Sequence, residues 1–228
     1  MNKENNTNFL VIALPSGKLF KPSIRLFEEV GIDLKGGKEI NRKLAFFNQE
    51  EEIKFVITRP KDNPTYIECG VADIGIVGGD VLLEEKKDVY KLLDLKFGKC
   101  RMVVAAPKER EQKKYYKNNG HRLKVATKYP RIAADYFKKK DIYVELIKLY
   151  GSVELAPQVG LADMIVDIVS TGRTLKENKL VIIDEIDSFS AQLIINRISY
   201  KTKHKIIIRL LRDIKKFVSL ESDKIAEM

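Results

Sequence analysis

The sequence predicts an α/β protein of two lobes, each built on a mostly parallel β-sheet. The first observation is that short apolar runs alternate with segments of helical character along the chain, which favours strands connected by helices. The second is that this pattern restarts after Lys96. The third is the length of 228 residues, which is enough for two small domains.

The first half of the chain is expected to form five strands. Pro15, Ser16 and Gly17 end the first of them, and Ser16 is expected to cap a helix that continues to Val30. Asp80 is expected to cap a later helix. The strands are expected at Phe9–Leu14, Leu44–Phe47, Lys54–Ile57, Ala72–Val77 and Val89–Leu95.

The second half repeats the alternation. Strands are expected at Met102–Ala106, Leu123–Thr127, Val144–Leu149, Met164–Val169 and Leu180–Ile186. Helices are expected at Lys108–Asn119, Pro130–Lys139, Val153–Val159, Phe189–Asn196 and Thr202–Phe217. The last helix carries an apolar stripe from Ile206 to Phe217, which suits packing on its own lobe or contact with another subunit. We assign residues 1–95 and 180–228 to lobe I and residues 96–179 to lobe II.

Composition excludes several classes of protein. The longest apolar runs have six or seven residues, far short of the roughly 20 that a membrane helix needs. The chain has two cysteines and two histidines, and they lie far apart in the sequence, so neither a zinc site nor a histidine-based triad is predicted. We therefore expect a cytoplasmic protein with reduced thiols.

The net charge of +10 is compatible with binding to nucleic acid, to a membrane surface or to phosphorylated small molecules. Lysine is frequent throughout, and runs such as Lys138–Lys140 fall on predicted helices, as is usual for solvated faces. We therefore expect neither nucleic acid nor a membrane as a partner.

One stretch, residues 162–180, has the pattern of a phosphate site. The apolar run Met164–Val169 contains the carboxylate of Asp167 and is followed by the turn Ser170–Thr174 and a short helical segment. A turn of this kind presents backbone N–H groups at the positive end of a helix, where phosphate binds. Asp167 could accept hydrogen bonds from sugar hydroxyls. From these residues alone, a phosphate site and a merely capped turn are about equally well supported.

Polar and glycine-containing turns follow the ends of several predicted strands. They lie at Pro15–Leu19, Thr58–Asn63, Gly78–Asp80 and Ser170–Thr174. In open α/β sheets the carboxyl ends of strands form the edge at which ligands bind. A cleft between the two lobes, lined by these turns, is the expected site.

Several motifs in register resemble the ATP phosphoribosyltransferase family. They are GSVELAPQVGLADMIVDIVSTGRTLKENKL at 151–180, LPSGKL at 14–19, RKL at 42–44, RPKDNP at 59–64 and GVADIGIVGGD at 70–80. Together they extend over about residues 9 to 215. The resemblance implies a two-lobed arrangement like that of type II periplasmic binding proteins, with the active site in the inter-lobe cleft.

The resemblance implies a reaction as well. In this family, N1 of the adenine of ATP attacks C1 of phosphoribosyl pyrophosphate, and pyrophosphate leaves with inversion, in a Mg²⁺-dependent step of histidine biosynthesis. Such a reaction depends on positioning and on charge stabilisation. The resemblance implies Mg²⁺ held by the substrate pyrophosphate rather than by protein ligands.

Carried over by motif, the residues of lobe II would bind phosphoribosyl pyrophosphate. The 5-phosphate would lie against Ser170, Thr171, Gly172, Arg173 and Thr174. Glu154 and Asp167 would accept hydrogen bonds from the ribose hydroxyls, although Glu154 could instead only complement a helix dipole.

The residues of lobe I would bind ATP and the pyrophosphate. Arg42 and Arg59 are the expected catalytic residues because a guanidinium binds phosphate oxygens in bidentate fashion, although either could form a surface salt bridge. Gly17, Lys18, Arg59, Gly78 and Gly79 are the expected ATP contacts. Asp73 is expected to end a connection and not to touch ligand.

The chain resembles the short form of the family, which lacks a C-terminal regulatory domain of roughly 70 to 80 residues, about one small domain. We therefore expect a homodimer and a hetero-oligomer with a regulatory subunit that resembles histidyl-tRNA synthetase. Two alternatives stay open. A nucleobase phosphoribosyltransferase of salvage type also uses an S-T-G-x-T turn, and a two-lobed small-ligand binding protein shares the architecture.

Overall fold

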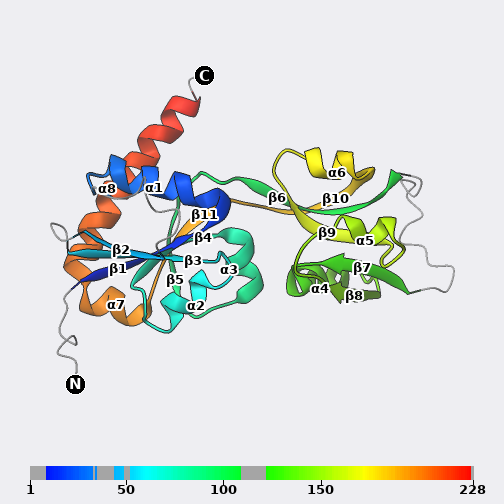
Figure 1. Ribbon diagram of the computed structural model, residues 1–228, viewed down its shortest axis with the longest axis horizontal. Coiled ribbons are helices and arrows are strands. Elements are labelled where there is room, and N and C mark those ends of the chain that lie inside the picture. The colour runs from blue at the N-terminus through cyan, green and yellow to red at the C-terminus, as the bar shows by residue number, and fades with distance from the viewer. Residues whose placement is uncertain (1–8, 33, 35–43, 49–51, 109–121, 227–228) are drawn as a thin grey trace. The chain divides into compact units, whose positions relative to one another are not determined.

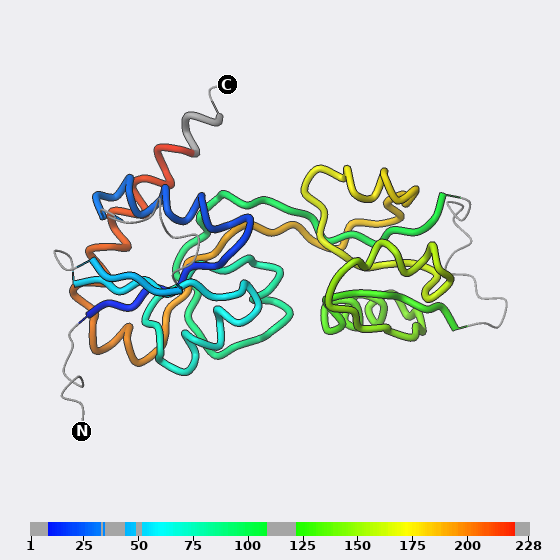
Figure 2. Tube along the Cα trace, viewed as in Figure 1, coloured from blue at the N-terminus to red at the C-terminus, as the bar shows by residue number. Residues whose placement is uncertain are grey.

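The computed structural model describes residues 9–32, 34, 44–48, 52–108 and 122–226, with side chains up to residue 221 (Figure 2). The chain forms two compact units: unit 1 contains residues 1–98 and 190–228, and unit 2 contains residues 99–189. The chain therefore passes from unit 1 into unit 2 once and returns once.

Unit 1 is built on a six-stranded sheet with strand order β2-β3-β1-β4-β11-β5 (Figure 1). Its strands are β1 (Leu10–Pro15), β2 (Ala45–Asn48), β3 (Ile53–Thr58), β4 (Ile74–Gly78), β5 (Tyr90–Asp94) and β11 (Ala191–Ile195). Its helices are the short 3-10 helix η1 (Gly17–Leu19), α1 (Phe20–Glu29), α2 (Asn63–Glu68), α3 (Gly79–Glu85), α7 (Arg197–Thr202) and α8 (His204–Ala226).

Successive side chains of a strand point to opposite faces of a sheet. Because the strands of this sheet carry apolar side chains on both faces, helices cover both. On one face α1 and α8 pack over the strands, and Phe27, Phe55 and Ile214 belong to one buried cluster. On the other face α2 and α3 contribute Ile67 and Val81 to a second cluster. The central strands β1 and β4 are buried on both sides, as their continuous apolar sequence predicts.

Unit 2 is built on a five-stranded sheet with strand order β10-β6-β9-β7-β8. Its strands are β6 (Cys100–Pro107), β7 (Leu123–Thr127), β8 (Val144–Lys148), β9 (Met164–Val169) and β10 (Leu180–Phe189). Its described helices are α4 (Pro130–Lys139), α5 (Leu155–Gln158) and α6 (Arg173–Glu177). The amphipathic α4 buries Ile132 and Phe137 on one face of the sheet, and α5 and α6 bury Ala156 and Leu175 on the other.

The expectation of mostly parallel sheets is wrong, since both sheets are mixed. In unit 1, β1 pairs in parallel with β3 and β4, and in unit 2, β7 pairs in parallel with β8 and β9. The other ladders of the described strands are antiparallel. The reason is that β6, β10 and β11 lie next to the places where the chain passes from one unit to the other, so they are not joined to their sheet neighbours by the crossover helices that parallel strands need.

The helix expected at Phe189–Asn196 is also wrong. Ala191–Ile195 forms β11, which is fully buried between β4 and β5. A short apolar run has no period that separates a buried strand from a buried helix, and pairing on both sides decides for the strand. The polar end of the run instead starts a helix, because the Asn196 side chain accepts hydrogen bonds from the backbone N–H groups of Ile198 and Ser199 at the start of α7.

Other boundaries differ from the expected ones. The units separate at residues 98/99 and 189/190 instead of 95/96 and 179/180, because all of β10 pairs with β6. Ser16 precedes η1 without a capping side-chain hydrogen bond, and Gly78, not Asp80, occupies the position before α3. Most of the helix expected at Lys108–Asn119 lies outside the described residues. Within the described part of the chain, no helix combines the length and apolar character needed to cross a membrane.

Candidate functional site

The turn after β9 has the strand–turn–helix geometry that the sequence predicted. β9 ends at Val169, Ser170 and Thr171 are exposed, and α6 begins at Arg173. Gly172 precedes the helix with φ of 76°, and a Cβ there would meet only Val169, at 3.8 Å. The glycine is therefore required by its left-handed backbone and not by crowding. Its absent side chain leaves the turn open to a ligand.

Asp167 is buried near the end of β9, on the face covered by α5 and α6. Its neighbours on the strand, Ile165 and Val169, belong to the cluster on that face, and alternation places Asp167 with them. Only 6% of Asp167 is exposed, and its Oδ1 accepts a hydrogen bond from the N–H of Ile168 at 2.9 Å. A carboxylate buried in a sheet normally has polar partners, and Asp167 makes a further interaction within the protein besides this hydrogen bond.

Glu154 lies on the same edge of the unit 2 sheet. It is half-buried and immediately precedes α5, which follows β8. Because β7, β8 and β9 run parallel, their carboxyl ends meet at one edge. A contact between helices fixes this arrangement, since the Gln158 side-chain amide donates to Oδ1 of Asn178 at 2.6 Å and so connects α5 to the end of α6.

Arg173 differs from the other residues of the turn. Its guanidinium donates to Glu177 at 2.9 Å one helical turn away, and 83% of its side chain is exposed. Thr174 is exposed at the second position of α6, and its carbonyl oxygen accepts from the side chain of Asn178. The turn thus offers the hydroxyls of Ser170 and Thr171 directly, whereas Arg173 would have to exchange its partner to bind a ligand.

In unit 1 the predicted residues also gather at one edge of the sheet. β1, β3 and β4 run parallel, so the turns that follow them lie together. Gly17 (φ 80°) and the exposed Lys18 follow β1, and the exposed Arg59 follows β3. Neither Lys18 nor Arg59 makes an ion pair with a residue that the structure describes. The surface salt bridge proposed as an alternative for Arg59 is therefore not found there.

Gly78 and Gly79 follow β4 at this edge. Gly78 is buried, and a Cβ built on it would lie 2.2 Å from Oδ1 of Asp80. Gly78 is thus needed to make room for the Asp80 carboxylate, which complements the positive end of α3. Gly79 is half-buried and begins α3. Arg42 lies outside the described residues.

Sequence reasoning missed two buried polar atoms at this edge. Oγ1 of Thr58 and Oε1 of Gln192 are buried and have no hydrogen-bond partner in the described part of the chain. Alternation places Thr58 with Val56 and Gln192 with Ile194, both on the face covered by α2 and α3. Buried polar atoms normally have partners, so both atoms are candidates for a bound group. Gln192 was hidden because its strand was expected to be a helix.

Asn63 presents a related case at the start of α2. Both polar atoms of its fully buried side chain lack a partner among the described residues. The side chain lies over Gly75 of β4, where a Cβ would be 2.6 Å from Oδ1 of Asn63. The backbone N–H of Asn63 donates to the carbonyl of Arg59. The Asn63 side chain therefore packs on the backbone of β4, and its two polar atoms are, like those of Thr58 and Gln192, candidates for a bound group.

Asp94 ends β5 beside Gln192, with which it is in register. It accepts hydrogen bonds from the Ser190 hydroxyl at 2.6 Å and from the backbone and side chain of Lys96. Burial alone would raise the pKa of Asp94, but these hydrogen bonds outweigh it and lower the pKa below its usual value. Ser190 is shared, because the Gln192 side-chain amide donates to its hydroxyl at 3.0 Å.

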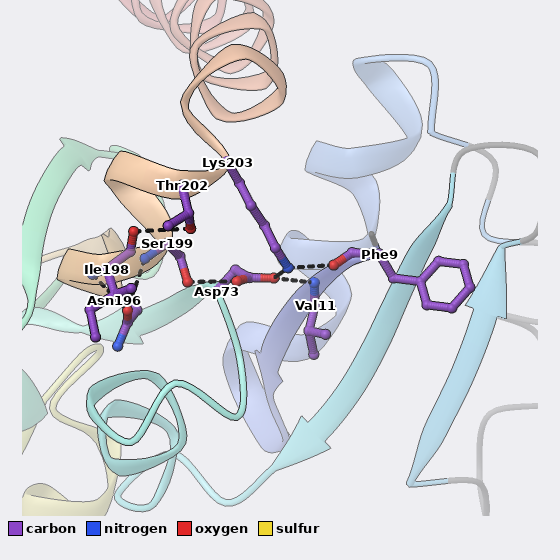
Figure 3. A network of polar contacts seen from close by, with 8 residues as sticks. All are labelled: Phe9, Val11, Asp73, Asn196, Ile198, Ser199, Thr202 and Lys203. Carbon is purple, nitrogen blue, oxygen red and sulfur yellow. Dashed lines mark hydrogen bonds and ion pairs between the residues drawn. The ribbon is translucent and has the colours of Figure 1, made fainter. Parts of the chain in front are cut away.

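The opposite edge of the unit 1 sheet holds a saturated network (Figure 3). The buried Asp73 accepts from the N–H of Val11 at 2.8 Å, the hydroxyl of Ser199 at 2.6 Å and the ammonium of Lys203 at 2.7 Å. Lys203 also donates to the carbonyl of Phe9. As the sequence indicated, Asp73 lies in a connection, directly before β4. Its hydrogen bonds connect Ser199 of α7, and Lys203 directly after α7, to Val11 of β1.

Metal ligands do not cluster in the described residues: no three or more His, Cys, Asp or Glu side chains lie close enough together to hold an ion. The polar groups at the two sheet edges are hydroxyls, amides, backbone N–H groups, cations and single carboxylates such as Asp167 and Glu154. This donor set suits an anionic or sugar-containing ligand.

Comparisons with known proteins agree with these features. A family model described as HisG, ATP phosphoribosyltransferase, matches residues 59–216. The ATP phosphoribosyltransferase of Caldanaerobacter subterraneus subsp. tengcongensis is 52% identical over 206 residues, which are 89% of this chain and 96% of that protein.

Solved structures agree as well. The fold is similar to the ATP phosphoribosyl transferase (HisG:HisZ) complex from Thermotoga maritima, with a TM-score of 0.79 and 35% identity over 92% of this chain and 99% of that chain. The periplasmic aliphatic sulphonate binding protein SsuA from Escherichia coli has a TM-score of 0.59 at 12% identity and covers 96% of this chain and 75% of its own. The latter likeness concerns the fold alone.

Proposed function

The chain belongs to the ATP phosphoribosyltransferase family, the pentosyltransferases of the first step of histidine biosynthesis, and we propose that each unit holds one of its two substrates. The enzyme transfers the phosphoribosyl group of phosphoribosyl pyrophosphate to ATP and releases pyrophosphate. In our assignment unit 2 binds phosphoribosyl pyrophosphate and unit 1 binds ATP.

The observation that carries this assignment is the turn after β9. Gly172 leaves the turn open in a left-handed conformation, and the exposed hydroxyls of Ser170 and Thr171 stand beside it. Backbone N–H groups of this turn and the side chains of Ser170, Thr171 and Thr174 would hold the 5-phosphate. Arg173 would contribute after leaving Glu177.

Asp167 and Glu154 would orient the ribose. Asp167 is buried immediately before the phosphate turn and Glu154 lies on the same edge, so two carboxylates would accept hydrogen bonds from the ribose hydroxyls. Holding the sugar at two ends fixes the position of C1. Positioning of this kind supplies much of the rate in a transfer that needs no covalent intermediate.

Unit 1 would supply the cations. Lys18 and Arg59 follow adjacent strands and make no ion pair with described residues, so their charge is available to phosphate oxygens. Gly17 and Gly79 would allow the nucleotide to approach the backbone, and Gly78, whose open side is filled by the Asp80 carboxylate, would shape the turn beside it. Arg42 would act with Arg59 on the leaving pyrophosphate. Charge stabilisation of the leaving group is then the main electrostatic contribution.

Mg²⁺ would enter the site with the pyrophosphate. Because Asp167 and Glu154 are assigned to the ribose, the ion would be held chiefly by phosphate oxygens. It would neutralise negative charge as the pyrophosphate leaves.

The partnership follows from the family. We propose that the enzyme acts in the cytoplasm, as a homodimer that joins a regulatory subunit similar to histidyl-tRNA synthetase. The solved structure with a TM-score of 0.79 is itself a HisG:HisZ complex, which supports a hetero-oligomer of this kind.

A substitution tests the division of substrates. We expect Asp167→Asn to raise the KM for phosphoribosyl pyrophosphate by about 10-fold, close to one charged hydrogen bond, and to leave the KM for ATP unchanged. Formation of phosphoribosyl-ATP, with the regulatory subunit present, gives both constants. Glu145→Gln, at an exposed position of β8, is the matched control. Equal increases in both KM values would show that Asp167 does not face the ribose.

A further inference from the structure

Helix α8 has two opposite faces of different character. Its buried face packs into the unit 1 core through Ile207, Leu210, Ile214 and Val218. The opposite face carries four exposed cations, Lys205, Arg209, Arg212 and Lys216. Their spacing of four, three and four residues keeps them within roughly 60° of one another on a helix of about 100° per residue. We call these four residues the α8 stripe.

The α8 stripe has no carboxylate partner in the described part of the chain. Some exposed arginines elsewhere do have one, since Arg25 pairs with Glu29 and Arg101 pairs with Glu185. Like charges three or four residues apart repel by a few tenths of a kcal/mol per pair. The stripe therefore does not stabilise the helix, which is held by its buried face.

A groove of about 570 Å³ lies between α1 and α8 and begins where the stripe ends. Lys216 belongs to both features, and Val30, Phe217 and Leu220 give the groove apolar walls. Leu220 is 53% exposed. Together with Val30 and Phe217 it gives the groove an apolar patch with charged residues around it, as is typical of a surface that another protein covers.

The charges around the groove distinguish a protein from a nucleic acid. Glu29, Asp213 and Glu221 also line it, and Arg25, its other cation beside Lys216, already pairs with Glu29 and Glu221, so a continuous run of phosphates would find few available cations inside the groove. A protein segment can place its carboxylates along the stripe and its apolar side chains in the groove. Complementary charge of this kind sets orientation and association rate.

We propose that the α8 stripe and the α1–α8 groove form the docking site for a carboxylate-bearing segment of the regulatory subunit. This inference rests on the hetero-oligomer of the proposed function and assigns its contact to one face of unit 1. The face is separate from the strand ends that hold the candidate substrate residues, because α8 packs along one side of the sheet. Docking there leaves the substrate edge unobstructed.

The test is a titration of the purified regulatory subunit into the full chain by isothermal calorimetry. We expect Arg209→Glu/Arg212→Glu to raise the Kd at least 100-fold, and the wild-type Kd to rise with salt because the contact is ionic. The control is Lys138→Glu/Lys139→Glu, an equal charge change at exposed positions of α4 in unit 2, which should bind as the wild type does.

The outcomes separate this inference from the proposed function. If the wild type binds and the α8 variant binds equally well, the docking site is wrong while the hetero-oligomer stands. If the wild type does not bind, both fall, although formation of phosphoribosyl-ATP would still identify the enzyme. Lys205→Gln/Lys216→Gln gives a second variant should the first fail to fold.

Two further measurements exclude other occupants. Light scattering of the chain alone should give the same mass for wild type and variant; a lower mass in the variant would make the surface a contact between two copies. A fluorescent single-stranded 20-nucleotide DNA should not bind tightly at 150 mM salt. Tight binding that the variant loses, with the subunit affinity unchanged, would overturn the proposal.

Discussion

Both edges of the unit 1 sheet contain buried polar residues, but the two edges differ in whether the buried polar atoms have hydrogen-bond partners. At the edge where β4 begins, Asp73 accepts three hydrogen bonds from Val11, Ser199 and Lys203 (Figure 3). At the edge where β3 ends and β11 begins, Thr58 and Gln192 each retain a buried atom without a partner among the described residues.

Whether a buried polar atom has a hydrogen-bond partner in the protein distinguishes structural residues from candidate binding residues better than the residue type does. A buried charge is tolerated when protein groups satisfy it, and the Asp73 network joins α7 and Lys203 to the start of β1. Unsatisfied buried atoms reduce stability by about 1–3 kcal/mol each, so they persist where something else compensates. We therefore assign the first edge to folding and the second to substrate binding, and each prediction below tests that division.

The largest effect is expected at the satisfied edge. Asp73→Leu should lower the free energy of unfolding by about 3–5 kcal/mol, because it leaves the Lys203 ammonium partly buried without its carboxylate. The kcat of the folded enzyme should not change. Urea unfolding and steady-state kinetics measure the two quantities.

The double variant Asp73→Leu/Lys203→Met is the internal control. It should be less destabilised than the sum of the two single variants, because it removes the pair together. A stable Asp73→Leu protein with little activity would mean that this edge binds substrate, contrary to our assignment.

At the other edge, Arg59→Ala should reduce kcat by about 100-fold, the size expected for removing one group that stabilises developing charge. The free energy of unfolding should change by less than about 0.5 kcal/mol, because Arg59 is exposed and makes no ion pair with described residues. Arg197→Ala, which breaks an exposed pair with Asp88, is the matched control and should keep full activity.

Much of the fold could be predicted from the sequence, because the alternation of apolar runs and helical segments placed nearly every strand and the turn after β9. The prediction failed where a short apolar segment has neither a helical nor a strand period. Ala191–Ile195 is apolar at all positions but Gln192, and its strand state depends on pairing with β4 and β5. The position of β10 likewise depends on a partner, β6, far away in sequence.

The site divides in the same way. Motifs predicted roles for Gly17, Arg59 and Asp167 because the chemistry of each is local to one turn or strand end, and these roles stay predictions. The unpartnered atoms of Thr58 and Gln192 could not be found, because satisfaction is a property of the folded neighbourhood. The reason for Gly78 was also hidden, since it depends on where the Asp80 carboxylate lies.

A smaller effect is expected at Gln192. Gln192→Leu removes the unpartnered acceptor along with one amide that donates to Ser190, so stability should change by less than about 1.5 kcal/mol. The KM for ATP should rise by about 10-fold and the KM for phosphoribosyl pyrophosphate should not. Thr58→Val tests the second atom in the same assay. Unchanged KM values in both variants would place these atoms outside the ATP site.

The smallest effect is expected at Asp94, which lies at the binding edge but is satisfied by Ser190 and Lys96. Hydrogen bonds lower its pKa in spite of burial, so its contribution to stability is present above the unfolded value of about 3.9 and is lost as pH falls through the folded pKa. Since Asp94 is partly exposed, Asp94→Asn should lose less than about 1 kcal/mol at pH 7.

That loss should shrink between pH 5 and pH 3 in urea unfolding, and the KM for ATP should stay unchanged throughout. The wild-type protein, unfolded at the same pH values, is the reference. A rise in the KM for ATP at Asp94→Asn would show that a satisfied carboxylate also binds substrate, so that satisfaction by protein groups would no longer separate the two edges.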